Sequence, residues 1–455
     1  MPAINDKIKE ESQEPNDSIA NRTRSKTGPL PSPWKNNQSK DLTAIAQCLL
    51  VESIPTTVEK LNQLLTQNTG LDYDEIFSPV ARYESVRIML AVATTEDFEI
   101  IQFDVKTAFL YGDLYETIYM KQPNGFKDGT DKVCLLLRSL YGLKQAPRQW
   151  NKRIDKFLRQ FGLKSTEYDP CIYTTNCGDL NVAMYDDGLI AGKSITKIDL
   201  INEMKLAMPA DPNVVLKRNI NEENQSIEEA RVPYRQLIGS LMYLAVGTRP
   251  DISYIVNKLS QFLEHPSNIH WSAAKRILKY LKGSATLGLK FGTPTETKNI
   301  ITAYSDADYA ACIDSRRSTS GVVVMLNGGP VIWSSRKQGI VATSTTDAEY
   351  MAAHEAAKEI VWAKGLLDSL GVNQTKPTKL YLDNVAAECL IKNSAFHKRT
   401  KHMDIKFHFT RDLVNQKKIE LIHVVSTNQK ADMLTKPLVK EKFLNNRNLI
   451  NFYQI

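Results

Sequence analysis

The sequence predicts a mixed α/β protein, and three observations along the chain support this prediction. Helical spacing of apolar residues over 85–95 is followed by the β-rich run "FEIIQFDV" at 98–105. Residues 234–282 read as successive helices separated at Arg249-Pro250 and Pro266. Strand patterns return from residue 299, and the later ones each lead into a helix. This alternation favours sheets covered by helices.

The composition is typical of a folded chain of several domains. A length of 455 residues with 42% hydrophobic residues allows roughly two to four domains. The 58 basic residues exceed the 51 acidic ones by enough to suit a polyanionic partner without identifying it. The six cysteines form no Cys-x-x-Cys pair, which argues against a zinc site and favours a reducing compartment.

The N-terminal sequence predicts neither secretion nor membrane insertion. Residues 1 to about 40 contain few apolar side chains, so we expect a disordered leader there. The longest apolar window, 237–246, is too short to span a bilayer. We therefore expect an intracellular protein, cytoplasmic or nuclear, with no membrane partner.

Two adjacent acids, Asp186 and Asp187, stand in the apolar run "VAMYDDGLIAG" at 182–192. An unpaired carboxylate in an apolar interior costs several kcal/mol, so such a pair suggests either a bound cation or a tight turn. Asp-Asp-Gly at 186–188 also suits the turn of a hairpin. Both interpretations stay open at this point.

Four further acids follow strands or begin helices in the C-terminal third. Their positions are the end of an alternating strand (Asp306), the first turn of a helix (Glu349), the residue after "KLYL" (Asp383) and the segment after "ELIHVVSTNQKA" (Asp432). If they meet in space, their hard oxygen ligands suit two Mg²⁺ ions roughly 3.5 to 4 Å apart, which is an arrangement for phosphodiester cleavage.

Each of these acids also has an ordinary structural interpretation. Glu349 follows Thr346 by three residues and fits a capping box. Asp383 and Asp432 fit helix N-caps, and Asp306 fits a turn with the acid two residues later.

Ten motifs carry a resemblance to a known family. They are "LDYDEIFSPVARYESVRIMLAVA", "FDVKTAFLYGDLYETIYMKQPNGF", "LYGLKQAPRQWNKR", "TRPDISYIVNKLSQF", "WSAAKRILKYLKGS", "YSDADYA", "STTDAEYMAAHEAAKE", "YLDNVAA", "KRTKHMDIKFHF" and "NQKADMLTKPL". In this order they resemble the reverse transcriptase and RNase H region of a copia-type retrotransposon Pol polyprotein. The resemblance covers residues 71 to about 205 and 231 to about 440.

For the first region the resemblance implies a polymerase site. Asp104 of "FDVKTAF", Asp186 and Asp187 would bind two Mg²⁺, with Mn²⁺ as an alternative. Four other positions are implied to contact template or incoming nucleotide: Arg87, Phe109, Gln145 and Tyr185. Phe109 matches the aromatic that screens the nucleotide 2′-OH, and a core phenylalanine is its ordinary alternative.

For the second region the resemblance implies ribonuclease H. Asp306, Glu349, Asp383 and Asp432 would hold two Mg²⁺ and cut the RNA strand of an RNA–DNA hybrid. Further contacts to nucleic acid are expected from the segment 397–402 and the helix after it: Lys398, Arg399, Lys401, His402 and His408. A solvated helix surface is the ordinary alternative for the histidines.

The resemblance also defines a domain plan with departures from the family. The expected parts are a leader with degenerate fingers (1–70), an incomplete palm (71–230), a helical connection (231–298), an RNase H-like domain (299–440) and a tail (441–455). A short polar stretch replaces the primer-gripping segment before residue 231, and Tyr185 directly precedes Asp186 where the family has one residue between them.

We therefore expect a truncated Pol fragment that has lost polymerase activity and retains Mg²⁺-dependent cleavage of hybrids. Its expected partners are an RNA–DNA hybrid and template RNA or DNA. The main alternative is a non-catalytic nucleic-acid-binding or inert product of a decayed element. An intact polymerase and an unrelated hydrolase with paired acids, as in glycosidases, are further alternatives.

Overall fold

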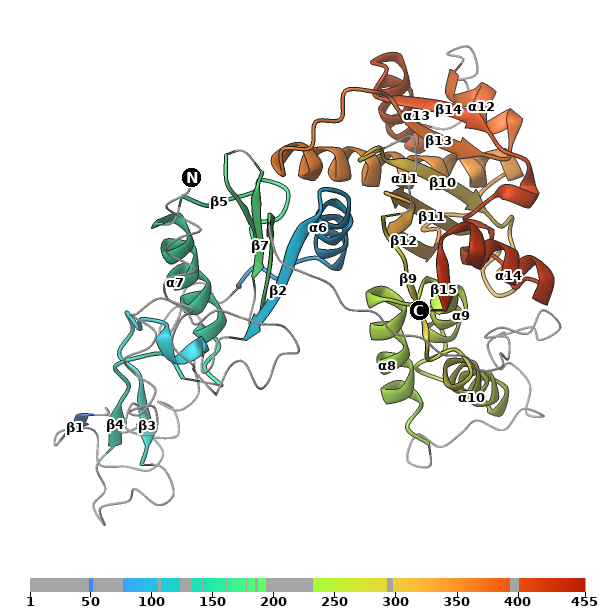
Figure 1. Cartoon of the computed structure of the whole chain (residues 1–455). Helices are drawn as coiled ribbons and strands as arrows, with labels where there is room; N and C mark the ends of the chain where they lie inside the picture. The colour runs from blue at the N-terminus through green and yellow to red at the C-terminus, as the bar shows by residue number, and fades with distance from the viewer. Residues whose placement is uncertain are drawn as a thin grey trace. The chain divides into compact units, whose positions relative to one another are not determined.

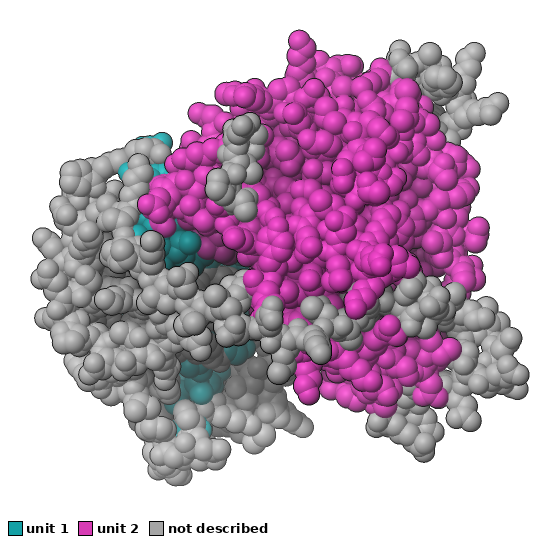
Figure 2. All heavy atoms as spheres, turned by 45° about the vertical axis from the view of Figure 1, so that its right-hand side comes forward, with its two compact units in different colours: residues 1–82, 99–193 teal, residues 83–98, 194–455 magenta. Residues whose placement is uncertain are grey.

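The computed structural model describes eleven segments of the chain in two compact units. The segments are 49–51, 77–104, 108–122, 133–140, 142–160, 162–176, 178–184, 187–193, 232–292, 298–392 and 401–454. Unit 1 comprises Met1–Arg82 and Glu99–Lys193, and unit 2 comprises Tyr83–Phe98 and Ser194–Ile455 (Figure 2). The expected leader and the polar stretch before residue 231 lie outside the described residues, and the predicted domain boundaries stay predictions.

Unit 1 is built on a five-stranded sheet with the order β2-β8-β7-β6-β5. Its strands are β2 (Phe98–Asp104), β5 (Lys164–Ser165), β6 (Ile172–Thr174), β7 (Leu180–Met184) and β8 (Asp187–Lys193). Strands β5 to β8 pair antiparallel in sequence order. A second sheet, ordered β1-β4-β3, is formed by β1 (Leu49–Val51), β3 (Tyr119–Lys121) and β4 (Val133–Leu135).

Helix α7 (Ala146–Gln160) and the 3-10 helix η1 (Ala108–Tyr111) complete the core of unit 1. The helix buries Trp150, Ile154 and Leu158, which recur every fourth residue and therefore lie on one face. This face packs with the buried strand residues Val182 and Met184. The four-residue spacing of these apolar side chains in the sequence therefore accounts for the face that α7 buries.

Unit 2 contains the predicted helical segment. Its elements are α8 (Tyr234–Gly247), η2 (Pro250–Ile252), α9 (Ser253–Ser260) and α10 (Asn268–Lys282). Pro250 is the first residue of η2, where the lack of an N–H has no cost, and Pro266 precedes the start of α10. Helix α6 (Tyr83–Thr95) also belongs to this unit, and β9 (Leu287–Leu289) pairs antiparallel with β15 (Phe452–Gln454).

The rest of unit 2 is a five-stranded mixed sheet with the order β12-β11-β10-β13-β14 (Figure 1). The strands are β10 (Thr302–Ala307), β11 (Thr319–Leu326), β12 (Gly329–Lys337), β13 (Thr378–Leu382) and β14 (Ile419–His423). Strands β10, β11 and β12 pair antiparallel, whereas β13 runs parallel to both β10 and β14. Asn327 and Gly328 connect β11 and β12 in a hairpin, and both have positive φ angles, of 50° and 84°.

Helices cover this sheet and follow its parallel strands. They are α11 (Thr345–Ser369), α12 (Val385–Lys392), α13 (Lys401–Asn415), the 3-10 turns η4 (Ser426–Asn428) and η5 (Asp432–Leu434), and α14 (Lys440–Leu449). Helix α11 packs on β10 and β11. The α/β fold class predicted from the sequence is therefore confirmed.

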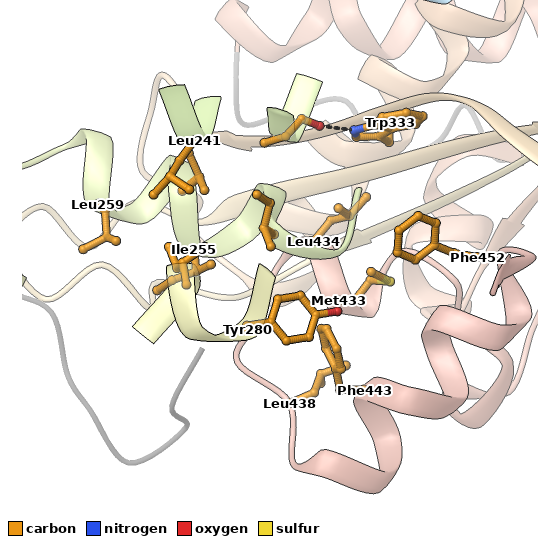
Figure 3. Packing of buried hydrophobic residues seen from close by; sticks show 14 of the residues in the cluster. Leu241, Ile255, Leu259, Tyr280, Trp333, Met433, Leu434, Leu438, Phe443 and Phe452 are labelled. Atoms are coloured by element: carbon orange, nitrogen blue, oxygen red, sulfur yellow. Dashed lines mark hydrogen bonds between the residues drawn. The ribbon is translucent and has the colours of Figure 1, made fainter. Parts of the chain in front are cut away.

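One hydrophobic core joins the helical segment, η5, α14 and the sheet of unit 2 (Figure 3). Leu241, Ile255 and Tyr280 from the helices meet Leu434 of η5 and Phe443 of α14 in this core. The indole Nε1–H of Trp333 donates a 2.8 Å hydrogen bond to the carbonyl of Ala245, drawn as a dashed line in Figure 3. This packing holds η5 next to the first strand of the sheet. Across the described segments, we find no helix with both the length and the apolar character needed to cross a bilayer.

Candidate functional site

Three carboxylates from three elements meet at one edge of the mixed sheet. Asp306 lies in β10, Asp383 directly follows β13, and Glu349 is in the second turn of α11. One carboxylate oxygen of each lies within 4.8 Å of the other two. Because β10 and β13 are parallel neighbours, their carboxyl ends lie at the same edge, and the packing of α11 on β10 adds the glutamate.

The structure replaces the capping interpretations of two of these acids. Ser344 is the N-cap of α11, and its hydroxyl accepts a 3.1 Å hydrogen bond from the backbone N–H of Asp347. Asn384 caps the next helix, where its side-chain oxygen accepts a 2.9 Å bond from the N–H of Ala387. Glu349 is therefore not needed for capping, and Asp383 lies one residue before the capping position.

The electrostatics of the cluster disfavour three negative charges. Burial, together with the neighbouring carboxylates Asp432 and Asp383, raises the pKa of Asp306 to about 6. Burial also raises the pKa of Glu349 to about 9, and the charges of Asp306 and Asp383 add to this effect. A negative charge on one of these carboxyl groups therefore raises the free energy of ionising its neighbours.

A divalent cation fits these residues. Oxygen Oε2 of Glu349 is buried and has no hydrogen-bond partner within the described part of the chain. Buried polar atoms without partners are rare, and a carboxylate oxygen is a hard ligand that suits Mg²⁺ or Mn²⁺. Asp306, Glu349 and Asp383 are the residues that would hold the ion.

The fourth predicted acid, Asp432, lies beside this group but not within it. It begins η5 and is completely buried. Its carboxylate pairs with two lysines: Nζ of Lys436 is 2.7 Å from Oδ1, and Nζ of Lys442 contacts Oδ2. Lys436 also lies 3.3 Å from Oδ2 of Asp306. The structure therefore brings three of the four acids together and connects the fourth to Asp306 through an ammonium group.

Sequence reasoning missed Lys436 and Lys442, although a signal for the first was present. Lys436 follows Asp432 by four residues in "NQKADMLTKPL", a spacing that favours an ion pair across one helical turn. Lys442 lies in the next helix, and local spacing does not place it near the acid.

In unit 1 the predicted polymerase residues lie on neighbouring strands. Asp104 is the last residue of β2, and Asp187 is the first residue of β8, the next strand in the sheet. Strands β7 and β8 pair antiparallel with Met184 opposite Gly188. This pairing agrees with the hairpin alternative, and the bound-cation alternative stays a prediction.

The structure does not describe the reacting groups of this predicted site. The side chains of Asp104 and Asp187 lie outside the described part of the chain, as do all atoms of Tyr185 and Asp186. Metal binding by the three acids and nucleotide contact by Tyr185 therefore stay predictions.

Arg87 has structural partners within unit 2. Its Nε–H donates to the carbonyl of Val331 at 2.7 Å, and Nη1 donates to the carbonyls of Val246 at 2.9 Å and Gly247 at 2.8 Å. Its guanidinium lies 3.9 Å from the ring centroid of Trp333. The contact with template or nucleotide expected from the sequence would require this buried arginine to leave these partners.

The other predicted contact residues occupy varied positions. Phe109 lies in η1, half-buried against the core of unit 1, and Gln145 is fully buried just before α7. His408 is exposed on α13. Lys398 and Arg399 lie outside the described residues, and for Lys401 and His402 only the helical backbone is described. Their contacts with nucleic acid stay predictions.

Comparison with family models and curated proteins identifies similar sequences. The model described as reverse transcriptase (RNA-dependent DNA polymerase) matches residues 59–216. A retrovirus-related Pol polyprotein from transposon TNT 1-94 of Nicotiana tabacum is 38% identical, over 91% of this chain and 35% of its own length. The corresponding polyprotein from transposon RE1 of Arabidopsis thaliana is 37% identical, over 83% of this chain and 29% of its own length. A putative transposon Ty5-1 protein of Saccharomyces cerevisiae is 33% identical over its whole length, which matches 56% of this chain.

The chain spans only about a third of the length of the two plant polyproteins.

Solved structures show weaker likenesses. A complex of LC11-RNase H1 with an RNA/DNA hybrid has a TM-score of 0.23 and 18% identity, covering 30% of this chain and 93% of that one. A foamy viral protease-reverse transcriptase with double-stranded DNA has a TM-score of 0.41 and 10% identity, covering 86% of this chain and 69% of that one. Likenesses at this level do not define a shared activity.

Proposed function

This chain belongs to the Pol family of copia-type retrotransposons, and we propose that its unit 2 is a metal-dependent ribonuclease H acting on RNA–DNA hybrids. The observation that carries the proposal is the approach of Asp306, Glu349 and Asp383 to within 4.8 Å of one another. They come from a strand, a helix and a strand end, and their common position requires the tertiary fold.

The residues of the site have separate tasks in this proposal. Asp306 is held by the hydroxyl of Thr435, which donates to its Oδ2, so one ligand is fixed before any ion arrives. Glu349 presents its unpartnered Oε2 from a helix whose N-terminal turn is fixed by Ser344. Asp383 is the more accessible ligand, and the hydroxyl of Ser426 donates to its Oδ2 at 3.1 Å.

Bound Mg²⁺ would supply activation of water and stabilisation of the leaving oxygen at the scissile phosphodiester. Preference for RNA would depend on contacts to the 2′-OH, which distinguishes RNA from DNA. The expected substrate is therefore the RNA strand of a hybrid.

The test is an assay of the purified chain on a labelled RNA–DNA duplex with Mg²⁺. We expect cleavage of the RNA strand by the wild type, and no cleavage by Asp383→Asn. A matched variant, Asp412→Asn, removes an exposed acid on α13 and should cut like the wild type. Equal cutting by Asp383→Asn would contradict the assignment.

A binding measurement beside the cleavage assay separates the catalytic proposal from the non-catalytic alternative. A chain that only binds nucleic acid would retain hybrid binding in EDTA, would lose it with added salt, and would cut nothing. Binding by gel shift at two salt concentrations measures this directly.

For unit 1 we propose polymerase ancestry with primer extension lost. The family model covers this region, and β8, which begins at Asp187, lies next to the strand that ends at Asp104. The sequence before residue 231 is a polar stretch where the family carries its primer-gripping segment. Misplacing the primer end by about 1 Å costs around 100-fold in rate. Primer extension above the level of an Asp104→Asn variant would contradict this proposal.

A further inference from the structure

The ammonium group of Lys436 bridges two buried acids of the candidate metal site. Its Nζ lies 2.7 Å from Oδ1 of Asp432 and 3.3 Å from Oδ2 of Asp306. The side chains of Asp432 and Asp306 are 0% and 2% exposed, whereas that of Lys436 is 38% exposed. The lysine thus reaches inward from the surface and places its charge between two carboxylates.

The segment around this lysine is held against the sheet. Lys436 follows η5, whose Met433 and Leu434 are buried in the core shown in Figure 3. The adjacent Thr435 bonds to Asp306 through its hydroxyl. The backbone of Lys436 is therefore fixed close to both acids, and only its side chain has to be positioned.

The charges divide the cluster into two positions for a cation. The first lies among Asp306, Glu349 and Asp383, and the described residues place no lysine contact on the last two. The second lies between Asp306 and Asp432, where the ammonium of Lys436 is found and where Lys442 also pairs with Asp432. An ion entering the second position has to displace the ammonium, because two cations a few ångströms apart repel strongly at low dielectric.

We infer that Lys436 acts as a resident cation at the second position, so that the free protein binds one divalent ion and not two. This inference rests on the proposed function, since it takes the acidic cluster to be a metal site. It makes Lys436 a positioning residue that keeps Asp306 and Asp432 in place when the second position holds no metal ion.

The test is isothermal titration of the whole chain with Mn²⁺ in the absence of nucleic acid, with Asp104→Asn as the common background so that the predicted polymerase acids of unit 1 do not add to the ion count. We expect the wild type to bind one ion at this site. Lys436→Met should bind a second ion, with its affinity raised about tenfold or more over the wild type, because the competing charge is gone. Lys436→Arg keeps a positive charge and should remain at one ion.

Two controls make the result specific. Lys442→Met removes the other ammonium on Asp432 but leaves the bridge intact, and it should still bind one ion. Asp383→Asn should lower the affinity for the first ion. That result would show that the titration reports binding at this cluster. Circular dichroism melting of each variant confirms that the fold is retained.

Two ions bound by the wild type, or an unchanged titration of Lys436→Met, would overturn the inference. The readout needs no substrate, so the absence of hybrid cleavage would count against the proposed function without changing the ion count. Conversely, a cleaving wild type that binds two ions would support the ribonuclease and refute the role of Lys436.

Discussion

Arg249 and Asp251 form a buried, bidentate ion pair between α8 and α9. Nε of Arg249 lies 2.9 Å from Oδ1, and Nη2 lies 2.7 Å from Oδ2. The arginine also donates to the hydroxyl of Ser284, and the hydroxyl of Tyr280 donates to Asp251. This network connects the junction of α8 and α9 with the end of α10.

Asp251→Asn is expected to destabilise the protein by about 3 to 5 kcal/mol, because it leaves the guanidinium of Arg249 buried without its counter-charge. Urea unfolding followed by circular dichroism measures the change. Lys279→Met removes an exposed charge on α10 and should change stability by less than about 0.5 kcal/mol. A loss below about 1 kcal/mol for Asp251→Asn would show that the pair is not structural.

Gly321→Ala is expected to abolish hybrid cleavage while the helices and sheets persist. An added Cβ would lie 2.7 Å from Cγ2 of Thr435, 2.9 Å from the carbonyl of Ala431 and 3.0 Å from Cβ of Leu434. The segment that carries Asp432 and Lys436 would have to move away from β11, and the bond from Thr435 to Asp306 on the neighbouring β10 would be lost.

The matched control for this variant is Gly239→Ala. Gly239 lies in α8, and a Cβ there meets no atom within 4 Å. Cleavage should be unchanged and stability should rise by about 0.5 to 1 kcal/mol, because alanine favours a helix over glycine. Equal cleavage by both variants would refute the importance of the close approach at Gly321.

Glu349→Gln is expected to raise the melting temperature of the metal-free protein at pH 7. The pKa of Glu349 in the fold is about 9, above its ordinary value of 4.5. The folded state therefore binds more protons than the unfolded state between these two values, and stability falls as the pH rises through this interval. Glutamine needs no proton uptake on folding, so the pH dependence between about 5 and 9 should become shallower.

Scanning calorimetry at pH 5, 7 and 8.5 in EDTA measures this effect. The difference between variant and wild type should grow with pH, and adding Mn²⁺ should stabilise the wild type alone. A constant difference across the three pH values would show that Glu349 is not responsible.

Arg87→Met is expected to destabilise unit 2 by about 2 to 3 kcal/mol and to leave hybrid binding unchanged. It removes three hydrogen bonds to carbonyls and the stacking on Trp333. Unfolding by urea and a gel shift with the hybrid separate the two effects. Weaker hybrid binding by Arg87→Met at unchanged stability would instead support the nucleotide contact implied by the family resemblance.

Local pattern was sufficient for much of the fold. Asp306 lies near the end of one apolar strand and Asp383 directly follows another, and two parallel neighbouring strands present their ends at one edge. The helices of 234–282 follow from their spacing and their prolines. The hairpin at Asn327-Gly328 follows from the need for positive φ angles.

Contacts between distant segments could not be predicted from local sequence pattern. The capping position assigned to Thr346 lies two residues earlier, at Ser344, because several residues near this helix start are competent caps. The position of α6 in unit 2 depends on carbonyls more than 150 residues away, as the bonds of Arg87 show. Lys442 reaches Asp432 only through the core that positions α14.

The pairing of β9 with β15 makes the segment between them a closed loop. Leu289 is opposite Phe452, so the chain leaves the helical segment, forms the whole mixed sheet, and returns to its point of departure. Phe452 is fully buried, although it lies three residues before the final one of the sequence. Deleting these last residues, or joining a bulky fusion partner directly after them, would therefore disturb the core. It would also open a loop of about 160 residues, whose closure has an entropic cost.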